Sequence, residues 1–256
     1  MRIDLNCDMG ESFGNYTIGL DDEVIKHITS ANIACGWHAG DPLVMNHTVA
    51  IAKQHNVGCG AHPGFPDLLG FGRRNMDCTP DEIKNYIIYQ VGALKAFCGM
   101  HKVEMTHVKP HGNLYLTAVQ DENIAQAVAE AIVSVDQDLW YVALAGDMGE
   151  RMRKVGERVG LRVVYEAFPD RAYTPDGNLL SRRQPGALIK DPQEVVERTL
   201  LMAKERKIVA TDGSTIEIDV ESLCVHGDNP SAVDLVKGIK KGMEEEGVEV
   251  KPMRAV

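Results

Sequence analysis

Residues 30–42 read SANIACGWHAGDP, and this stretch contains one complete transition from a strand to a helix. Ser30 to Cys35 is a short apolar run with the length of a buried strand. Gly40 permits a sharp turn after it. Asp41-Pro42 has the composition of a helix start, because aspartate is a preferred N-cap residue and proline fits the first turn. The stretch therefore predicts a β-strand followed directly by an α-helix.

The same pattern repeats along the chain. Helical segments are marked by apolar stripes such as Ile83 to Leu94, and by starts such as Thr79-Pro80 and Asp191-Pro192, each followed by a capping-box glutamate. Asn229-Pro230 has the same helix-start composition. Seven strands are predicted: Ile3 to Asp8, Ser30 to Cys35, Val57 to Ala61, Thr106 to Lys109, Trp140 to Ala145, Val163 to Ala167, and Ser222 to Val225. This alternation predicts an α/β fold with a parallel sheet, either closed as a βα barrel or open and doubly wound.

Composition and charge exclude several classes of protein. The chain has 256 residues, with 27 Lys and Arg against 37 Asp and Glu, and a formal charge of −10. This length suits one large α/β domain or two small ones. The acidic balance disfavours a nucleic acid or an anionic membrane as the main partner. No run approaches the roughly 18 apolar residues of a membrane helix.

The N-terminus and the cysteines indicate a cytoplasmic protein. Residues 1–8 form a predicted strand and lack the apolar region of a secretion signal. The six cysteines contain no Cys-x-x-Cys pair, which disfavours a zinc ribbon or a thioredoxin-type motif. We therefore expect free thiols in a reducing compartment, buried as small apolar groups.

Four of the nine histidines follow predicted strands, each with a glycine within two residues: His38, His62, His111 and His226. The carboxyl ends of parallel strands meet on one face of a βα fold. We therefore expect these histidines to surround one pocket, together with Asp8, Glu11, Asp41, Lys109, Asp170 and Asp228. His107 lies inside a predicted strand and is expected to be structural.

A cluster of imidazoles and carboxylates supports two kinds of chemistry. It suits a divalent metal such as zinc or manganese, which polarises a carbonyl or activates water. It also suits metal-free acid–base catalysis with Lys109 as an electrostatic stabiliser. Asp41 has two interpretations of similar weight, a helix N-cap and a site residue. Asn229 is expected to be a cap, which leaves Asp228 available for chemistry.

Two long loops, residues 63–78 and 168–190, have the length of lids or binding loops, and a surface hairpin or an oligomer contact is the alternative. Arg73 and Arg74 in the first loop either grip a carboxylate or phosphate or are simply exposed. The sequence has no Walker A motif and no G-x-S-x-G motif, which disfavours a standard P-loop and a serine hydrolase.

A series of segments, in order along nearly the whole chain, resembles the LamB/YcsF family. The segments are Ile3–Gly14, Ser30–Pro42, Gly60–Asp67, Gly70–Arg74, His107–Gly112, Phe168–Arg171, Ser181–Ile189 and Leu223–Asp228. Such an ordered set is more specific than any single motif. Pro169 stands where alanine is expected, and this departure affects no candidate polar group.

The resemblance implies a seven-stranded parallel βα barrel similar to polysaccharide deacetylases, as a single domain of residues 1–256. It implies that the 5-oxo-L-proline ring is opened to L-glutamate, with ATP as co-substrate, in a complex with the B and C subunits of a 5-oxoprolinase. Two alternatives stay open: a metal-dependent amide hydrolase or deacetylase that acts without ATP, and a non-catalytic binding subunit.

On this basis we expect three groups of site residues. The expected catalytic residues are Asp8, His38, His62, Lys109, His111 and Asp228. The residues expected to bind substrate are Glu11, Asp41, Arg73, Arg74, Asp170, Arg171 and His226. If a divalent metal is bound, the expected ligands are Asp8, His38 and His62.

Overall fold

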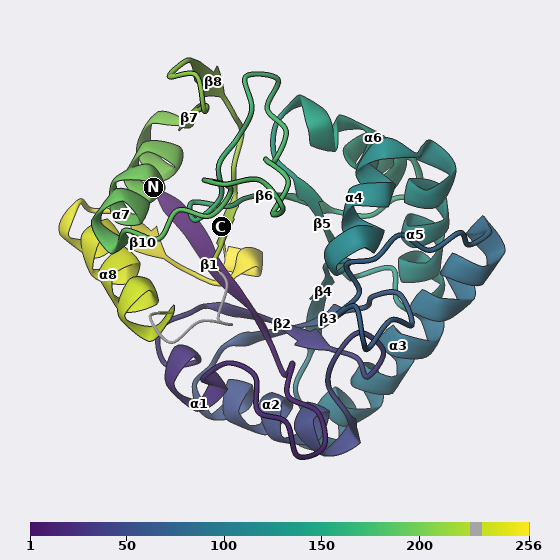
Figure 1. Ribbon diagram of the computed structural model, residues 1–256. Helices are drawn as coiled ribbons and strands as arrows, with labels where there is room; N and C mark the ends of the chain where they lie inside the picture. Colours follow the sequence, from purple (N-terminus) through teal and green to yellow (C-terminus); the bar gives the residue numbers. More distant parts are fainter. Residues whose placement is uncertain (226–231, 256) are drawn as a thin grey trace.

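The structure is a computed structural model that describes residues 1–225 and 232–255. Seven parallel strands follow chain order around a closed barrel (Figure 1): β1 (Arg2–Met9), β2 (Ser30–Ala34), β3 (Gly58–His62), β4 (Met105–Val108), β5 (Trp140–Leu144), β6 (Val163–Ala167) and β9 (Ser222–Cys224). Asp4 to Asn6 of β1 pair with residues 222–224 of β9, and this pairing closes the barrel. The seven predicted strands are confirmed, each within one residue of its predicted bounds, and the closed barrel decides against an open sheet.

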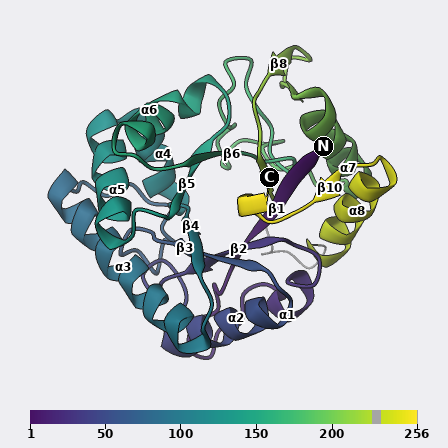
Figure 2. The ribbon, with the colours of Figure 1, turned by 180° about the vertical axis from the view of Figure 1, so that it is seen from behind.

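Helices form a ring outside the strands (Figures 1 and 2): α1 (Asp21–Val24), α2 (Pro42–Gln54), α3 (Pro80–His101), α4 (Gly112–Gln120), α5 (Glu122–Val135), α6 (Glu150–Arg158), α7 (Pro192–Leu200) and α8 (Ala232–Glu245). Thr79 and Glu82 form the predicted capping box of α3. Asp191 caps α7 through Gln193 N, but the described residues contain no reciprocal bond to Glu194. Asn229-Pro230 lies outside the described residues.

Several short elements complete the described chain. β7 (Lys207–Val209) and β8 (Thr215–Glu217) form an antiparallel hairpin apart from the barrel. The remaining helical turns are η1 (Asp147–Gly149), the π-helical η2 (Leu201–Glu205) and η3 (Met253–Ala255). All six cysteines are free thiols, as predicted, and five of them are buried. Every helix in the described ranges is too short or too polar to span a membrane.

The two faces of β1 differ in polarity. Side chains alternate across a strand, and Ile3, Leu5 and Cys7 belong to the apolar core that also contains helix residues. The alternate residues point into the barrel, where they contact side chains of other strands: Asp4, Asn6 and Asp8. The interior along β1 is therefore polar from the start of the strand to its carboxyl end.

The C-terminal segment covers the amino end of the barrel. β10 (Glu249–Val250) pairs with Arg2 and Ile3 at the start of β1. The following η3 lies within the ring of strands in both views (Figures 1 and 2). Met253 of this turn is buried and packs against Val142 and Val164. The opposite end of the barrel, where the strands end, is left for the polar residues described next.

Candidate active site at the carboxyl ends of the strands

Six polar side chains converge where the first four strands end. Asp8 lies in β1 and His62 is the last residue of β3. The other four stand in the loops that begin at strand ends: Glu11, His38, Lys109 and His111. All but Asp8 are buried, and the Asp8 side chain is largely buried. Parallel pairing brings these residues together, since every strand ends at the same rim of the barrel.

The histidines contact one another directly. His111 Nδ1 lies 2.9 Å from His62 Nε2. The rings of His38 and His111 stack in parallel, with centroids 3.6 Å apart and an interplanar angle of 3°. Asp8 Oδ2 lies 3.3 Å from His62 Nε2, and Glu11 Oε1 lies 3.5 Å from His38 Nε2. The structure therefore brings together three of the four histidines that were expected at one pocket: His38, His62 and His111.

Two backbone carbonyls determine which ring nitrogens carry protons. His62 Nδ1 lies 2.7 Å from the carbonyl oxygen of Lys109, and His111 Nε2 lies 2.8 Å from that of Phe71. A carbonyl oxygen can only accept, so each of these nitrogens must donate its proton. In the neutral rings the lone pairs of His62 Nε2 and His111 Nδ1 then face each other at 2.9 Å. This arrangement requires a shared proton or a bound cation between them.

Burial favours the neutral forms of His38 and His111. It lowers the pKa of His111 well below its ordinary value, and the neighbouring His38 and His62 lower it further. Burial likewise lowers the pKa of His38 well below its ordinary value. Neither ring nitrogen of His38 has a hydrogen-bond partner among the described residues. Neutral imidazoles with a lone pair available for coordination are the form that binds a metal ion.

The donor set fits a divalent transition metal. One ligand atom from each of four residues lies within 4.8 Å of the others: Glu11, His38, His62 and His111. Three imidazoles and one carboxylate suit zinc or a similar ion. The carbonyls that accept from His62 and His111 are the outer partners that usually orient such ligands. Of the predicted ligands, His38 and His62 belong to this set, whereas Asp8 lies beside it and Glu11 and His111 join it.

Lys109 is held by protein groups on three sides. Its ammonium nitrogen lies 3.0 Å from Asp8 Oδ1, from Glu166 Oε1 and from Cys224 Sγ. Burial opposes the charged form, but the carboxylates of Asp8 and Glu166 outweigh it and raise the pKa of Lys109 well above its ordinary value. Lys109 is therefore a buried cation that holds Asp8, whose Oδ1 also accepts from Asn32 Nδ2.

The sequence analysis missed four residues that shape this site. Glu166 pairs with Lys109 and accepts from Asn6. Asn32 donates to Asp8, and Phe71 orients His111 through its carbonyl. The alternation of side chains along β1, β2 and β6 was the available signal, because it places Asn6, Asn32 and Glu166 on the inner face. His107 is structural, as predicted, with Thr106 and Asn32 as partners of its two ring nitrogens.

Other predicted site residues have different surroundings. Asp41 caps α2, and its carboxylate accepts from the backbone N–H groups of Leu43, Val44 and Gly14. The guanidinium of Arg74 pairs with the carboxylate of Asp67 within the same loop.

The remaining predicted site residues are Arg73, Asp170, Arg171, His226 and Asp228. Arg73 lies over the ring of Phe71, which adjoins the histidines. Asp170 and Arg171 are buried beside β6, and Arg171 donates to the carbonyl oxygens of Ala187 and Leu180. His226 and Asp228 lie outside the described residues.

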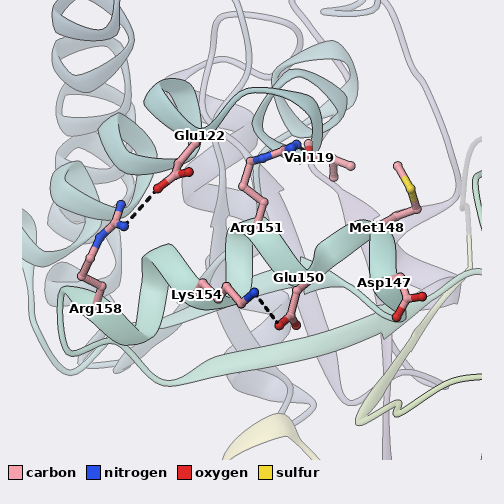
Figure 3. A pocket seen from close by; sticks show the side chains of 8 residues that line it. All are labelled: Val119, Glu122, Asp147, Met148, Glu150, Arg151, Lys154 and Arg158. Atoms are coloured by element: carbon pink, nitrogen blue, oxygen red, sulfur yellow. Dashed lines mark hydrogen bonds and ion pairs between the residues drawn. The ribbon is translucent and has the colours of Figure 1, made fainter.

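A pocket of about 420 Å³ lies among the outer helices α4, α5 and α6 (Figure 3). Its charged side chains neutralise one another, with Glu122 paired to Arg158 and Glu150 to Lys154. No histidine or cysteine lines it. The strand ends therefore remain the candidate active site.

Comparison with known proteins places the chain within one family. Residues 3–256 match the sequence profile of the LamB/YcsF family. The chain is 54% identical over 254 residues to the A subunit of 5-oxoprolinase from Pyrococcus horikoshii, covering 99% of this chain and 98% of that protein. It is 50% identical over 255 residues to the A subunit of 5-oxoprolinase from Clostridium beijerinckii, covering 100% and 99%.

A solved structure has the same fold over the same length. It is the crystal structure of the lactam utilization protein from Thermus thermophilus, which superposes with a TM-score of 0.92 at 43% sequence identity. The superposition covers 98% of this chain and 99% of the other.

Proposed function

The chain belongs to the LamB/YcsF family, and from this membership we propose that it is the A subunit of an ATP-dependent 5-oxoprolinase. The reaction is the hydrolytic opening of 5-oxo-L-proline to L-glutamate, coupled to hydrolysis of ATP, in a complex with the B and C subunits. Relatives at 50% to 54% identity that are named as the A subunit of 5-oxoprolinase support the assignment. The observation that carries the catalytic role is the buried Lys109–Asp8–His62 arrangement at the barrel mouth.

A five-membered lactam is a poor electrophile, and ATP provides the activation. Transfer of the γ-phosphoryl group to the lactam carbonyl oxygen makes the ring carbon electrophilic and releases ADP. One water then adds to this carbon, and the carbon–nitrogen bond breaks as the nitrogen takes up a proton. A second water replaces the phosphate on the acyl carbon, so the products are glutamate, ADP and phosphate.

The residues at the barrel mouth have separate roles in this reaction. The Asp8 carboxylate, whose Oδ2 atom lies 3.3 Å from His62 Nε2, accepts the proton of the attacking water. Lys109 pairs with the Asp8 carboxylate and orients it. Arg73 at the rim binds the substrate carboxylate. Arg171 lines the same rim, and Asp228 and His226 remain predicted site residues.

The four-residue cluster would hold a divalent metal: Glu11, His38, His62 and His111. When bound, such an ion polarises a carbonyl oxygen and lowers the pKa of a coordinated water. The protein's own contribution is to hold these side chains neutral or anionic in a buried site and to fix their orientation through the carbonyls of Lys109 and Phe71.

Exposed apolar side chains around the mouth support the presence of a partner protein in the complex. Tyr16, Leu43 and Leu69 follow β1, β2 and β3 and are exposed, Leu69 to 94%. We expect a partner subunit to cover these apolar side chains at the loops and helix start that follow the strands. The six free thiols suit the reducing cytoplasm in which we place the complex.

The decisive experiment measures glutamate release from 5-oxo-L-proline by this chain mixed with the B and C subunits. We expect release only when all three proteins and ATP are present. Omitting ATP and omitting this chain are the two controls. If an assembled complex releases no glutamate, the substrate assignment is wrong.

The metal cluster also favours a second candidate, a metal-dependent amide hydrolase that acts alone. It predicts ATP-independent hydrolysis of 5-oxo-L-proline or of another amide by this chain without partners, together with stoichiometric metal. A purely binding role predicts that His38→Ala and His62→Ala leave the reconstituted complex fully active. Retained activity in both variants would exclude our catalytic assignment.

A further inference from the structure

Glu166 is a fully buried carboxylate inside the barrel. It lies in β6, points into the barrel and has 0% exposure. Its Oε1 atom lies 3.0 Å from Lys109 Nζ and accepts from Asn6 Nδ2 at 2.9 Å. Its Oε2 atom accepts from the Tyr115 hydroxyl at 3.5 Å. These contacts are all with protein side chains, and the cation among them is Lys109.

The surroundings of Lys109 explain what Glu166 does. An ammonium group has three N–H bonds, and three atoms lie 3.0 Å from Lys109 Nζ: Asp8 Oδ1, Glu166 Oε1 and Cys224 Sγ. Lysine is a flexible side chain with four rotatable bonds, so a single contact with Asp8 would not hold it still. Three contacts from three different strands fix the position of the nitrogen.

We infer that Glu166 is a positioning residue that acts on the reaction through Lys109. Glu166 fixes the ammonium of Lys109. The fixed ammonium then holds Asp8 Oδ1, so that Asp8 Oδ2 faces His62. This inference rests on the proposed function, because that function places Asp8 and His62 next to the reacting groups.

The negative charge of Glu166 is what the role requires. A buried carboxylate without a cation is strongly unfavourable, so Glu166 and Lys109 stabilise each other's burial. Glutamine has nearly the same shape and can still accept from Asn6. Glu166→Gln therefore keeps the packing and weakens the anchor, whereas a purely structural role would lower the stability and leave kcat of the folded enzyme unchanged.

The test measures kcat and KM for 5-oxo-L-proline in the reconstituted complex. We expect Glu166→Gln to lower kcat by about 10- to 100-fold, the usual effect of removing an outer partner of an active-site group. KM should stay within about twofold, because Glu166 is fully buried and its contacts are with protein side chains. Tyr115→Phe is the matched control, since it removes the Tyr115 contact of Glu166 and leaves the contacts with Lys109 and Asn6.

A double variant separates positioning from general structural damage. If Glu166 acts only through Lys109, adding Glu166→Gln to Lys109→Met lowers kcat no further. An additive loss in the double variant, or a Glu166→Gln enzyme with normal kcat, overturns the inference. Thermal unfolding of each variant confirms that the compared proteins are folded.

The inference can fail independently of the proposed function. If the wild-type complex releases no glutamate, the proposed function is wrong, and a crystal structure of the Glu166→Gln chain decides the inference instead. We expect Lys109 Nζ to move away from Asp8 or Cys224 in that crystal. An unchanged Lys109, still 3.0 Å from both partners, overturns it.

Discussion

Two buried histidines show how surroundings decide the role of one residue type. Both ring nitrogens of His107 have partners, Thr106 Oγ1 at 2.7 Å and Asn32 Oδ1 at 2.8 Å. His38 is equally buried, yet neither of its ring nitrogens forms a hydrogen bond with a described residue. Burying an unsatisfied polar atom is unfavourable unless a ligand completes it. His38 is therefore the residue whose substitution tests the metal site most directly.

We expect the wild-type chain to bind about one equivalent of Zn²⁺ or Mn²⁺, and His38→Ala to weaken that binding at least about tenfold. The reason is the loss of one of four donor atoms. Isothermal titration with the metal alone, after dialysis against a chelator, measures the effect. His47→Ala is the matched control, since His47 forms a histidine–carboxylate pair with Asp22 on the surface. Metal binding unchanged by His38→Ala would contradict the assigned ligand set.

Asp4, inside the barrel, makes stability depend on pH. Burial raises its pKa from 3.8 to about 6, against hydrogen bonds from Ser222, Ser30 and Thr29 that lower it. The folded state therefore holds the proton more tightly than the unfolded state. The resulting stabilisation is fully present below pH 3.8 and is lost as the pH rises to about 6.

Asp4→Asn removes this dependence, because the amide stays neutral. From pH 4 to pH 7 the stability of the variant relative to wild type should rise by about 2 kcal/mol, at about 1.4 kcal/mol for each unit of pKa. Urea unfolding at both pH values measures the change, and any constant cost of the amide cancels. A relative stability that is the same at pH 4 and pH 7 would show that Asp4 titrates normally.

At the level of single elements, the loop between β3 and α3 forms one wall of the site. It supplies the carbonyl of Phe71 that orients His111, and Gly72 follows with φ of +62°. A β-carbon at Gly72 would lie 2.8 Å from His38 Cβ and 2.7 Å from His111 Cδ2. The loop can approach the stacked rings this closely only because residue 72 has no side chain.

Gly72→Ala should therefore damage the site more than the fold. We expect about 100-fold lower activity of the reconstituted complex, since small displacements of reacting groups have effects of that size. Gly177→Ala is the matched control, because Gly177 has a similar φ of +77° and no atom within 4 Å of the added carbon. Both variants should lose about 1–2 kcal/mol of stability from the strained backbone. Equal activity in the two variants would rule out the contact with the histidines as the cause.

Across the molecule as a whole, the two ends of the barrel have separate tasks. The carboxyl end holds the polar cluster, whereas the amino end is covered by β10 and η3. Met253 of η3 is buried against Val142 and Val164. Substitutions at the amino end should therefore lower stability without lowering activity, and substitutions in the polar cluster at the carboxyl end should lower activity.

Met253→Ala tests this separation. The lost packing should lower the free energy of unfolding by about 2–4 kcal/mol, as for other buried methionines. Activity per folded molecule should stay at the wild-type level, since Met253 packs at the end remote from the histidines. Met100→Ala, at a residue that is 60% exposed, is the control and should change stability by less than about 0.5 kcal/mol. A large loss of activity in folded Met253→Ala would show that the two ends are coupled.

Local signals predicted much of the fold because they act over a few residues. Short apolar runs located all seven barrel strands, and Thr79-Pro80 located the start of α3. The resemblance to the LamB/YcsF family implied the barrel and its number of strands. The residues after strands were also identified locally, so His38, His62 and His111 were expected in one pocket before their contacts were known.

How those residues meet depends on contacts between distant segments. Closure of the barrel through β1 and β9 sets the register that brings Glu166 and Asp8, far apart in the chain, to Lys109. The proton positions on His62 and His111 depend on carbonyls of other segments, which no local pattern encodes. The amino-acid order alone was thus enough to find the strands, the family and the chemical groups at the strand ends. The ligand set and the role of Glu166 emerged from the folded chain, because contacts between distant strands exist only once the barrel has closed.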